Sequence, residues 1–142
     1  MSIRTIRDVA RLDVVTCRPD DDAVRLAQLM RNEAVDSVVV IQDNHPLGVV
    51  TDRDLAMRVV AGGVDEGGTY ARELMSDHPA TIRDDLGVAE AVKEMDANGV
   101  RQLPVVDGGD ELVGIVDLDD ILRELVRDYE HLAGVLATES PD

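Results

Sequence analysis

Apolar residues along the chain follow either a strand-like or a helical spacing, and segments of the two kinds alternate. Val14–Cys17 is a short β-like run, and the acidic triplet Asp20–Asp22 that follows suits the start of a helix. That helix is predicted to end at Val35, and its apolar residues recur at helical spacing: Ala23, Leu26, Ala27 and Met30. Ser37–Ile41 is then a continuous, mostly β-branched run, which predicts a strand buried on both faces.

A turn, a second strand and a second helix are predicted next. Asp43–Pro46 has turn composition, Leu47–Thr51 is the predicted partner strand, and Asp52–Ala61 is the predicted helix. Gly62–Gly68 is rich in glycine and predicts a flexible connector. Ahead of all these elements, Ile3–Ala10 predicts a short helix or lead-in segment.

The remainder of the chain replays this order of elements. The predicted elements are a strand at Thr81–Ile82, a helix over Leu86–Asn98 capped by Gly99, strands at Gln102–Val106 and Leu112–Val116 around the turn Asp107–Asp110, and a last helix from about Leu118. The last helix is longer than its counterpart in the first half. Its apolar residues keep helical spacing over about four turns: Ile121, Leu122, Leu125, Val126, Tyr129, Leu132, Ala133 and Leu136. Core packing and self-association are both compatible with that stripe.

The two halves also align residue by residue. With one residue inserted in the turn, the matched pairs include Thr16 with Thr81, Asp20 with Asp85, Met30 with Met95, Gly48 with Gly114 and Asp54 with Asp120. Each unit spans roughly 60 residues, more than most solenoid repeats, so one compact body of two units is expected. The predicted fold class is α/β, built from two β-α-β-β-α units. The predicted ranges are 8–64 for unit one, 62–71 for the connector, 72–127 for unit two, and 128–142 for a C-terminal helix extension and tail.

The charge of the chain limits the partners that it is expected to bind and indicates the environment in which it works. Of 142 residues, 30 are acidic and 14 basic, a net charge of −16, and Lys93 is the only lysine. So acidic a chain is not expected to bind nucleic-acid backbones or anionic membranes. Acidic blocks and scarce lysine suggest a halophile with a salty cytosol, because salt screens such self-repulsion. No secretory signal or membrane span is apparent, and Cys17 is the only cysteine, so a cytoplasmic location is expected.

Three phrases connect the repeat to a known family. They are Leu47–Leu55 (LGVVTDRDL), Val100–Asp107 (VRQLPVVD), and Val113–Val116 followed by Asp119–Ile121 (VGIV and DDI). With the repeated element order, they make the chain resemble a tandem pair of CBS (cystathionine β-synthase) domains over roughly Val9 to Leu125. The resemblance implies a pseudo-two-fold Bateman-type module without a catalytic domain, and a homodimer shaped as a flat disc. It also implies clefts for AMP, ADP, ATP or S-adenosylmethionine.

The family's ligand motif, Ser/Thr-x-x-Asp, is matched by Thr51 and Asp54. The resemblance implies that the Asp54 carboxylate binds the ribose of the ligand, since its two oxygens can accept hydrogen bonds from both ribose hydroxyls. Thr51 would then donate to a phosphate, and Arg53 offers a guanidinium fork for the same group. Without a ligand, Thr51 and Asp54 would be an ordinary helix cap and a first-turn acid.

Adenine is expected against the segment before the first helix and the start of the next strand, with equivalents in unit two. The candidate residues are Thr16, Arg18, Pro19, Asp36, Ser37 and Val38 in unit one, and Thr81, Arg83, Arg101, Gln102, Leu103 and Pro104 in unit two.

The second half-site departs from the motif, because Asp117 stands where unit one has Thr51, while Asp120 is kept. A carboxylate repels phosphate, so one nucleotide site per chain is expected. The second half-site would be empty, or would bind adenosine or the cationic S-adenosylmethionine. Pairing of Arg83 or Arg101 with Asp117 would soften this repulsion.

Catalysis is not expected. His45, His78 and His131 share no metal-ligand spacing with one another or with Cys17, and Gly62–Gly68 lacks the Gly-Lys-Ser/Thr ending of a phosphate loop. The predicted function is therefore a regulatory module that senses an adenosine compound and signals to a protein partner not identifiable from the sequence. The alternatives are an assembly protein with a degenerate pocket and an S-adenosylmethionine binder.

Overall fold

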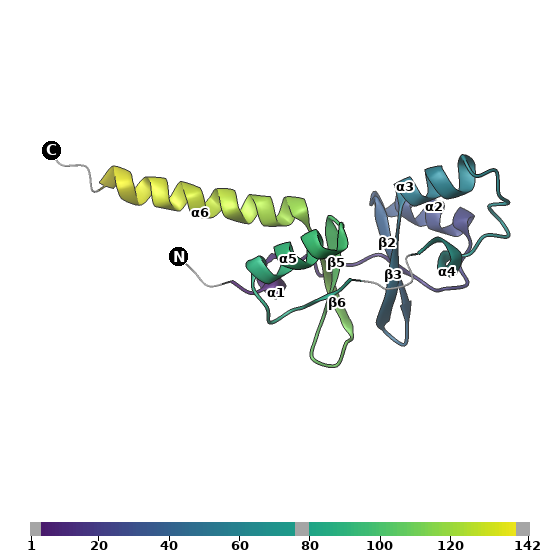
Figure 1. Cartoon of the computed structure of the whole chain (residues 1–142), viewed down its shortest axis with the longest axis horizontal. Helices are drawn as coiled ribbons and strands as arrows, with labels where there is room; N and C mark the ends of the chain where they lie inside the picture. The colour runs from purple at the N-terminus through teal and green to yellow at the C-terminus, as the bar shows by residue number, and fades with distance from the viewer. Residues whose placement is uncertain (1–3, 76–79, 139–142) are drawn as a thin grey trace.

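The computed structural model describes residues 4–75 and 80–138, which form two units of the same topology (Figure 1). Unit one contains β1 (Thr16–Cys17), α2 (Ala23–Glu33), β2 (Ser37–Gln42), β3 (His45–Thr51), α3 (Asp52–Asp54) and a π-helical turn, η1 (Leu55–Val60). Unit two contains β4 (Ile82–Arg83), α5 (Val88–Asn98), β5 (Gln102–Val106), β6 (Leu112–Asp117) and α6 (Leu118–Thr138). Two short helices, α1 (Ile6–Val9) and α4 (Ala71–Leu74), precede the units. The predicted α/β class and repeated units are confirmed.

Each unit has a three-stranded mixed sheet. The orders are β1-β2-β3 and β4-β5-β6, with the first pair parallel and the second antiparallel in both sheets. The predicted burial of the central strand is confirmed for Ser37–Val40, which are all buried, whereas Ile41 is half-buried. Its irregularity is repeated too: the register shifts between Val40 and Ile41 in one sheet and between Val105 and Val106 in the other.

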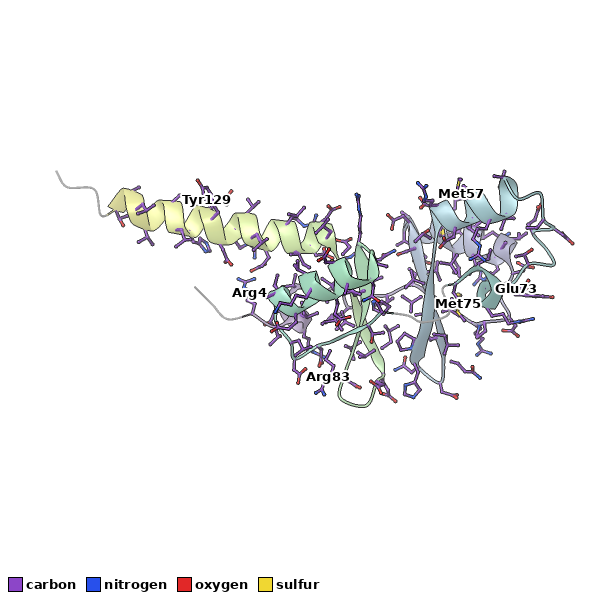
Figure 2. The ribbon with its side chains drawn as sticks, viewed as in Figure 1. Arg4, Met57, Glu73, Met75, Arg83 and Tyr129 are labelled. Atoms are coloured by element: carbon purple, nitrogen blue, oxygen red, sulfur yellow. The ribbon has the colours of Figure 1, made fainter. Side chains whose placement is uncertain are left out.

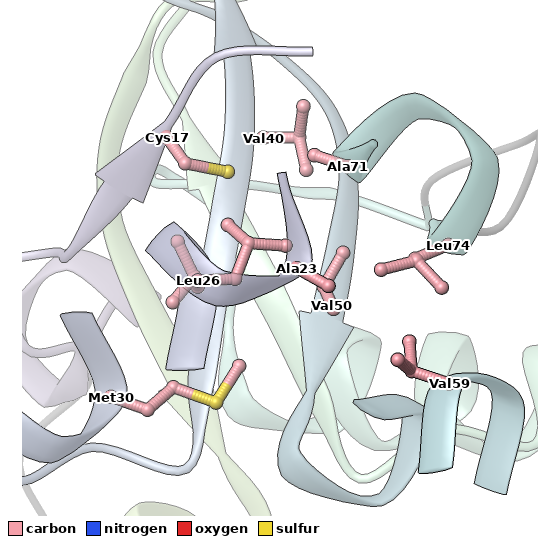
Figure 3. Close-up of a cluster of buried hydrophobic side chains, with 10 residues drawn as sticks. Cys17, Ala23, Leu26, Met30, Val40, Val50, Val59, Ala71 and Leu74 are labelled. Carbon is pink, nitrogen blue, oxygen red and sulfur yellow. The ribbon is translucent and has the colours of Figure 1, made fainter. Parts of the chain in front are cut away.

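The short helices are exchanged between the units. Ile6 of α1 belongs to the core of unit two, and its amide donates to the Leu86 carbonyl at 2.7 Å. Ala71 and Leu74 of α4 belong to the core of unit one, where Ala71 lies beside Val40 and Leu74 beside Val59 (Figure 3). Each unit is therefore completed by a segment that precedes the other unit in the sequence.

Two equivalent glycines make room for the crossing segments. A Cβ on Gly48 would lie 2.8 Å from the Met75 Cβ, and one on Gly114 would lie 2.8 Å from the Arg11 carbonyl oxygen. Met75 follows α4 and lies beside β3 (Figure 2), while Arg11 follows α1 and pairs with Ile115 of β6. A side chain at either glycine would push the crossing segment off its strand.

Three helix boundaries differ from the predictions. α2 ends at Glu33, because Ala34 takes a left-handed conformation (φ 54°) and the Val35 amide returns to the Met30 carbonyl. The predicted helix over Asp52–Ala61 is α-helical only at its start and continues as the π-helical η1. α5 begins at Val88 because Leu86 is in a turn, while its predicted cap at Gly99 is confirmed (φ 63°).

Candidate functional site

A cleft of about 770 Å³ opens where β3 and β6 end and the helices after them begin. Eight of the predicted residues line this cleft: Asp36, Thr51, Arg53, Asp54, Arg101, Gln102, Pro104 and Asp117. They come from both units, as expected for a ligand held between two repeats.

Thr51 and Asp54 form a reciprocal cap at the start of α3. The Asp54 amide donates to Thr51 Oγ1 at 3.1 Å, and the Thr51 amide donates to Asp54 Oδ2 at 2.8 Å. The cap fixes both side chains at the rim of the cleft. The Thr51 hydroxyl hydrogen remains available to donate, because Oγ1 acts only as an acceptor in this cap.

Three arginines line the cleft: Arg53, Arg58 and Arg101. Arg58 is positioned by η1 and donates to the carbonyl oxygens of Leu74 and Glu73 at 2.7 and 2.9 Å. It thereby ties α4 to the cleft wall. Guanidinium groups in such a place suit phosphate oxygens.

The cleft also has an apolar wall. Val49, Ala80, Val100, Pro104 and Leu118 contribute to its lining. Val100 is 37% exposed, so part of its surface is open to a ligand. Such side chains can cover the faces of a flat ring.

The second half-site repeats the cap with Asp117 in place of threonine. The Asp120 amide donates to Asp117 Oδ1 at 2.8 Å, and the Asp117 amide donates to Asp120 Oδ2 at 3.0 Å. Asp117 therefore caps α6 through a carboxylate oxygen, in the same way that Thr51 caps α3 through its hydroxyl oxygen.

Arginines of the chain itself bind this second pair of carboxylates. Arg11 lies 2.9 Å from Asp117 Oδ2 and 3.7 Å from Asp120 Oδ2, and Arg123 lies 2.6 Å from Asp120 Oδ1. Asp120 is only 8% exposed. Arg83, one of the two arginines considered as partners of Asp117, instead binds Asp85 at 2.9 Å. Arg101 lines the cleft but makes no ion pair with Asp117 in residues 80–138.

Thr16, Arg18 and Pro19 lie away from Thr51. They line a separate hollow of about 920 Å³ next to the turn between β2 and β3. The reason is strand direction: β1 runs parallel to β2 with Cys17 opposite Val40, so residues after β1 reach the far end of the sheet. The expectation that this segment meets the Thr51 motif is not met.

The remaining candidates lie in the packed interior or on the surface. Val38 and Leu103 are fully buried in their cores. Ser37 is buried and its hydroxyl donates to Gln102 Oε1 at 2.9 Å. Thr81 is half-buried just before β4 and does not line the cleft, and Arg83 is exposed.

Sequence reasoning missed Arg11, Arg58 and Arg123. Arg11 and Asp117 are separated by 106 residues, and neither local spacing nor the repeat indicates that they meet. Arg123 follows Asp120 by three residues on a helix, a spacing that does favour an ion pair and was available as a signal.

Cys17, His45 and His131, the cysteine and histidines of the described ranges, show no constellation typical of catalysis. Burial, and secondarily the Asp21 charge, raise the pKa of the Cys17 thiol to about 12, so it stays protonated. No group of three or more His, Cys, Asp or Glu side chains suited to a metal is found within 4–75 and 80–138. His78 lies outside these ranges. No helix in the described ranges is long and apolar enough to cross a membrane.

Comparison with known proteins accounts for this architecture. An uncharacterized protein of Methanopyrus kandleri is 41% identical over 120 residues, which are 84% of this chain but only 61% of that protein. The CBS domain-containing protein YhcV of Bacillus subtilis is 32% identical over 82% of each chain. A CBS domain pair solved with 5′-methylthioadenosine and S-adenosyl-L-methionine is 20% identical, with a TM-score of 0.78 over 89% of this chain and 99% of the other, and shows the shared fold.

The family profile of the CBS domain covers both units. It matches residues 6–61 and again residues 71–127, which together are most of the chain. The two matches coincide with the two sheets and the helices that flank them. The chain therefore belongs to the CBS domain family, as a tandem pair of CBS units.

Proposed function

We propose that this CBS pair is a regulatory module that binds one adenosine-containing ligand per chain at Thr51 and Asp54. The observation that carries the proposal is an asymmetry between two equivalent carboxylates. Asp54 lines the cleft, and within the described ranges no side-chain cation is found paired with it. Asp120 is buried and binds Arg11 and Arg123. Of these two equivalent carboxylates, only Asp54 is therefore open to a ribose.

The surrounding groups complete such a ligand. Asp54 Oδ1 accepts from a ribose hydroxyl, since Oδ2 already serves the Thr51 amide. The Thr51 hydroxyl and the Arg53 and Arg58 guanidinium groups bind phosphate oxygens. Val49 and Val100 cover the faces of the base.

The response to the ligand follows from the position of the cleft. Its walls come from both units, and Leu118 and Asp119 of α6 line it together with Thr51 of the other unit. A ligand that contacts both walls binds more tightly when the two units are close together than when they are apart. It therefore shifts the population toward the closed arrangement. The relative position of the units is then the signal that a partner reads.

S-adenosylmethionine is a second candidate, favoured by the charge of the cleft. Five carboxylates line it, those of Asp36, Asp52, Asp54, Asp117 and Asp119, against three arginines. An excess of carboxylates attracts a sulfonium cation and repels a triphosphate. The related pair solved with S-adenosyl-L-methionine shows that this fold accommodates such a compound.

The test is a binding panel by calorimetry and thermal melting in molar KCl. The ligands are AMP, ADP, ATP, adenosine and S-adenosylmethionine. A ligand that binds only the folded chain raises its stability by about 2.7 kcal/mol at a hundredfold excess over Kd, which is easily measured. Asp54→Asn is compared with Asp52→Asn, because Asp52 lines the same cleft two residues away.

The proposal expects one ligand per chain and a loss of binding in Asp54→Asn alone. Equal losses in both variants would mean that general cleft charge, not ribose recognition, drives binding. Two equal sites per chain would contradict the single-site assignment. If no compound binds, the assembly-protein alternative replaces sensing.

A further inference from the structure

Opposite charges stand at equivalent positions of the two helical segments that follow the sheets. Arg53 of unit one aligns with Asp119 of unit two, and Arg58 aligns with Glu124. Arg53, Arg58 and Asp119 line the cleft, whereas Glu124 is buried and does not line it. At these two positions the cations therefore belong to unit one, which is the side of the cleft that suits the anionic part of a ligand.

Arg58 and Glu124 have the same structural role in their units. Arg58 Nη1 and Nη2 donate to the carbonyl oxygens of Leu74 and Glu73 at 2.7 and 2.9 Å, which ties η1 to the end of α4. Glu124 Oε1 lies 2.7 Å from Arg4, which ties α6 to the segment just before α1. Each unit thus holds its exchanged segment by a side chain at this position, but only the one in unit one is exposed and lines the cleft.

The C-terminal end of α4 depends on Arg58. A helix of four residues is too short to be stable alone, and the last carbonyl groups of any helix need partners from elsewhere. The Ala71 carbonyl accepts from the Met75 amide at 2.9 Å, and Arg58 satisfies the last two carbonyls of α4. The other end is anchored independently of the cleft, because the Ala71 amide donates to the Asp21 carbonyl at 2.8 Å.

The Arg58 guanidinium group has donors left for a ligand. Two of its N–H groups serve α4, and the others can bind an anionic oxygen in the cleft. Such charge-assisted hydrogen bonds are about twice as strong as neutral ones. An exposed arginine loses much rotational freedom when it is held in one conformation. A ligand that already fixes this side chain therefore strengthens its bonds to α4.

α4 is placed to carry a response from the cleft to both units. It lies beside β3 (Figure 1), and its residues Ala71 and Leu74 complete the core of unit one. It also directly precedes unit two in the sequence, and Leu74 lines the cleft. A change in how firmly α4 is docked therefore acts on the segment that joins the units.

We infer that Arg58 makes the module respond to the anionic group of its ligand and not to adenosine alone. The inference rests on the proposed function, because it requires an adenosine-containing ligand at Thr51 and Asp54. A phosphate beyond the ribose binds the guanidinium group and thereby stabilises the docked α4. Adenosine fills the same site but has no anionic group for Arg58, so it leaves α4 unchanged. Arg58 is a positioning residue for α4, and through α4 it determines which ligands produce a response.

The test is amide hydrogen exchange of the native chain, measured by NMR in molar KCl without ligand and with AMP or adenosine. Each ligand is used at the same multiple of its Kd, so that general stabilisation by binding is equal. The reporters are the amides of Glu73, Leu74 and Met75, which donate to carbonyls at the start of α4. AMP is expected to slow their exchange about tenfold, the effect of one further hydrogen bond to a charged group. Adenosine is expected to leave their exchange nearly unchanged.

Two lysine variants separate the tie to α4 from general cleft charge. Arg58→Lys keeps the positive charge but replaces the planar fork by a single ammonium group, which cannot hold two carbonyls and an anion in the same geometry. AMP should bind this variant more weakly and no longer slow the exchange of the α4 amides. Arg53→Lys is the matched control, because Arg53 lines the same cleft and the bonds of Arg58 to α4 have no counterpart from it among the described residues. It should also bind AMP more weakly, but it should keep the response of α4.

Equal exchange of the α4 amides with AMP and with adenosine would overturn the inference, and so would a response to AMP that persists in Arg58→Lys. In either case, a loss of AMP binding in Asp54→Asn would still support the proposed function. A native chain that binds adenosine but not AMP would also overturn the inference, since the cleft would then accept no anionic group. If no adenosine compound binds, the inference and the proposed function fail together.

Discussion

Ser37 and Gln102 occupy the same position in their respective units, 65 residues apart, and hydrogen-bond to each other at 2.9 Å. Contact between equivalent residues places them at the pseudo-two-fold axis, because the rotation that superposes the units exchanges the two. His45 Nδ1 and the Asp110 carbonyl oxygen, 2.8 Å apart, are also separated by 65 residues. The units therefore meet along a line that runs from the cleft to the hairpin turns.

A double-mutant cycle on Ser37 and Gln102 measures this junction. Each alanine substitution removes one partner of a buried or half-buried hydrogen bond, so each is expected to lower the free energy of unfolding by about 1 kcal/mol. The double variant should lose less than the sum of the two, because the second change finds no bond left to break. Strict additivity in urea unfolding would show that the bond contributes nothing across the axis.

Gly114→Ala tests the crossing of the lead-in segment over β6. The added Cβ meets a backbone carbonyl 2.8 Å away, which no side-chain rotation relieves, so a loss of about 1–3 kcal/mol is expected. Gly134→Ala is the matched control, since its Cβ meets nothing within 4 Å and α6 should gain up to about 1 kcal/mol of helix propensity. Equal melting temperatures for the two variants would contradict the crossing.

Arg11→Gln tests whether the second half-site is closed by the chain itself. Removal of the guanidinium leaves Asp117 without its cation and Asp120 with Arg123 alone. We expect a stability loss of about 1 kcal/mol and new binding of S-adenosylmethionine at a second site, seen as a rise in calorimetric stoichiometry. Arg7→Gln, which removes the 2.9 Å pair with Asp84 in the same segment, should leave stoichiometry unchanged. If the stoichiometry rises in both variants, the cause is loosening of the segment and not loss of the Arg11 guanidinium.

Cys17 provides a probe of pH dependence. Its folded-state pKa, about 12, lies above that of an unfolded thiol, so the unfolded chain loses its proton first as pH rises. This contribution to stability is complete below pH ~8.5 and is lost between pH ~9 and ~12. Thiol reagents at pH 8 should label the native chain only as fast as it opens, and Cys17→Ser should remove this part of the alkaline loss. Rapid labelling of the native chain would disprove the burial.

Salt is expected to stabilise the folded chain, because it screens the repulsion between the acidic side chains. With a net charge of −16, self-repulsion acts over ~10 Å at 0.1 M salt and only ~3 Å at 1 M. We expect the melting temperature to rise between dilute buffer and molar KCl, consistent with a halophilic source. Equal melting temperatures in the two buffers would rule out that interpretation.

Local pattern predicted most of the fold, because its signals lie within a few residues of one another. The β-branched run predicts the burial of Ser37–Val40. The glycine at position 99 predicts the left-handed helix end, which the structure shows at φ 63°. The Thr51 and Asp54 pair was found from the ligand motif of the family that the chain resembles, and only its aspartate recurs in unit two, as Asp120. Long-range pairings were not predictable: no spacing indicates that Arg11 reaches Asp117, or that the segment after β1 ends beside the β2–β3 turn.

The exchanged short helices have a consequence for synthesis of the chain. Residues 6–11 are translated well before their partners at 84–117, so they wait without a binding surface while unit one is being made. Unit one, in turn, remains incomplete until Ala71 and Leu74 emerge. Neither half can close its core as an independent nascent unit, and the contacts that complete the molecule are among those most distant in sequence. In a crowded cell, two chains translated side by side could trade these segments and form an intertwined pair with the same contacts.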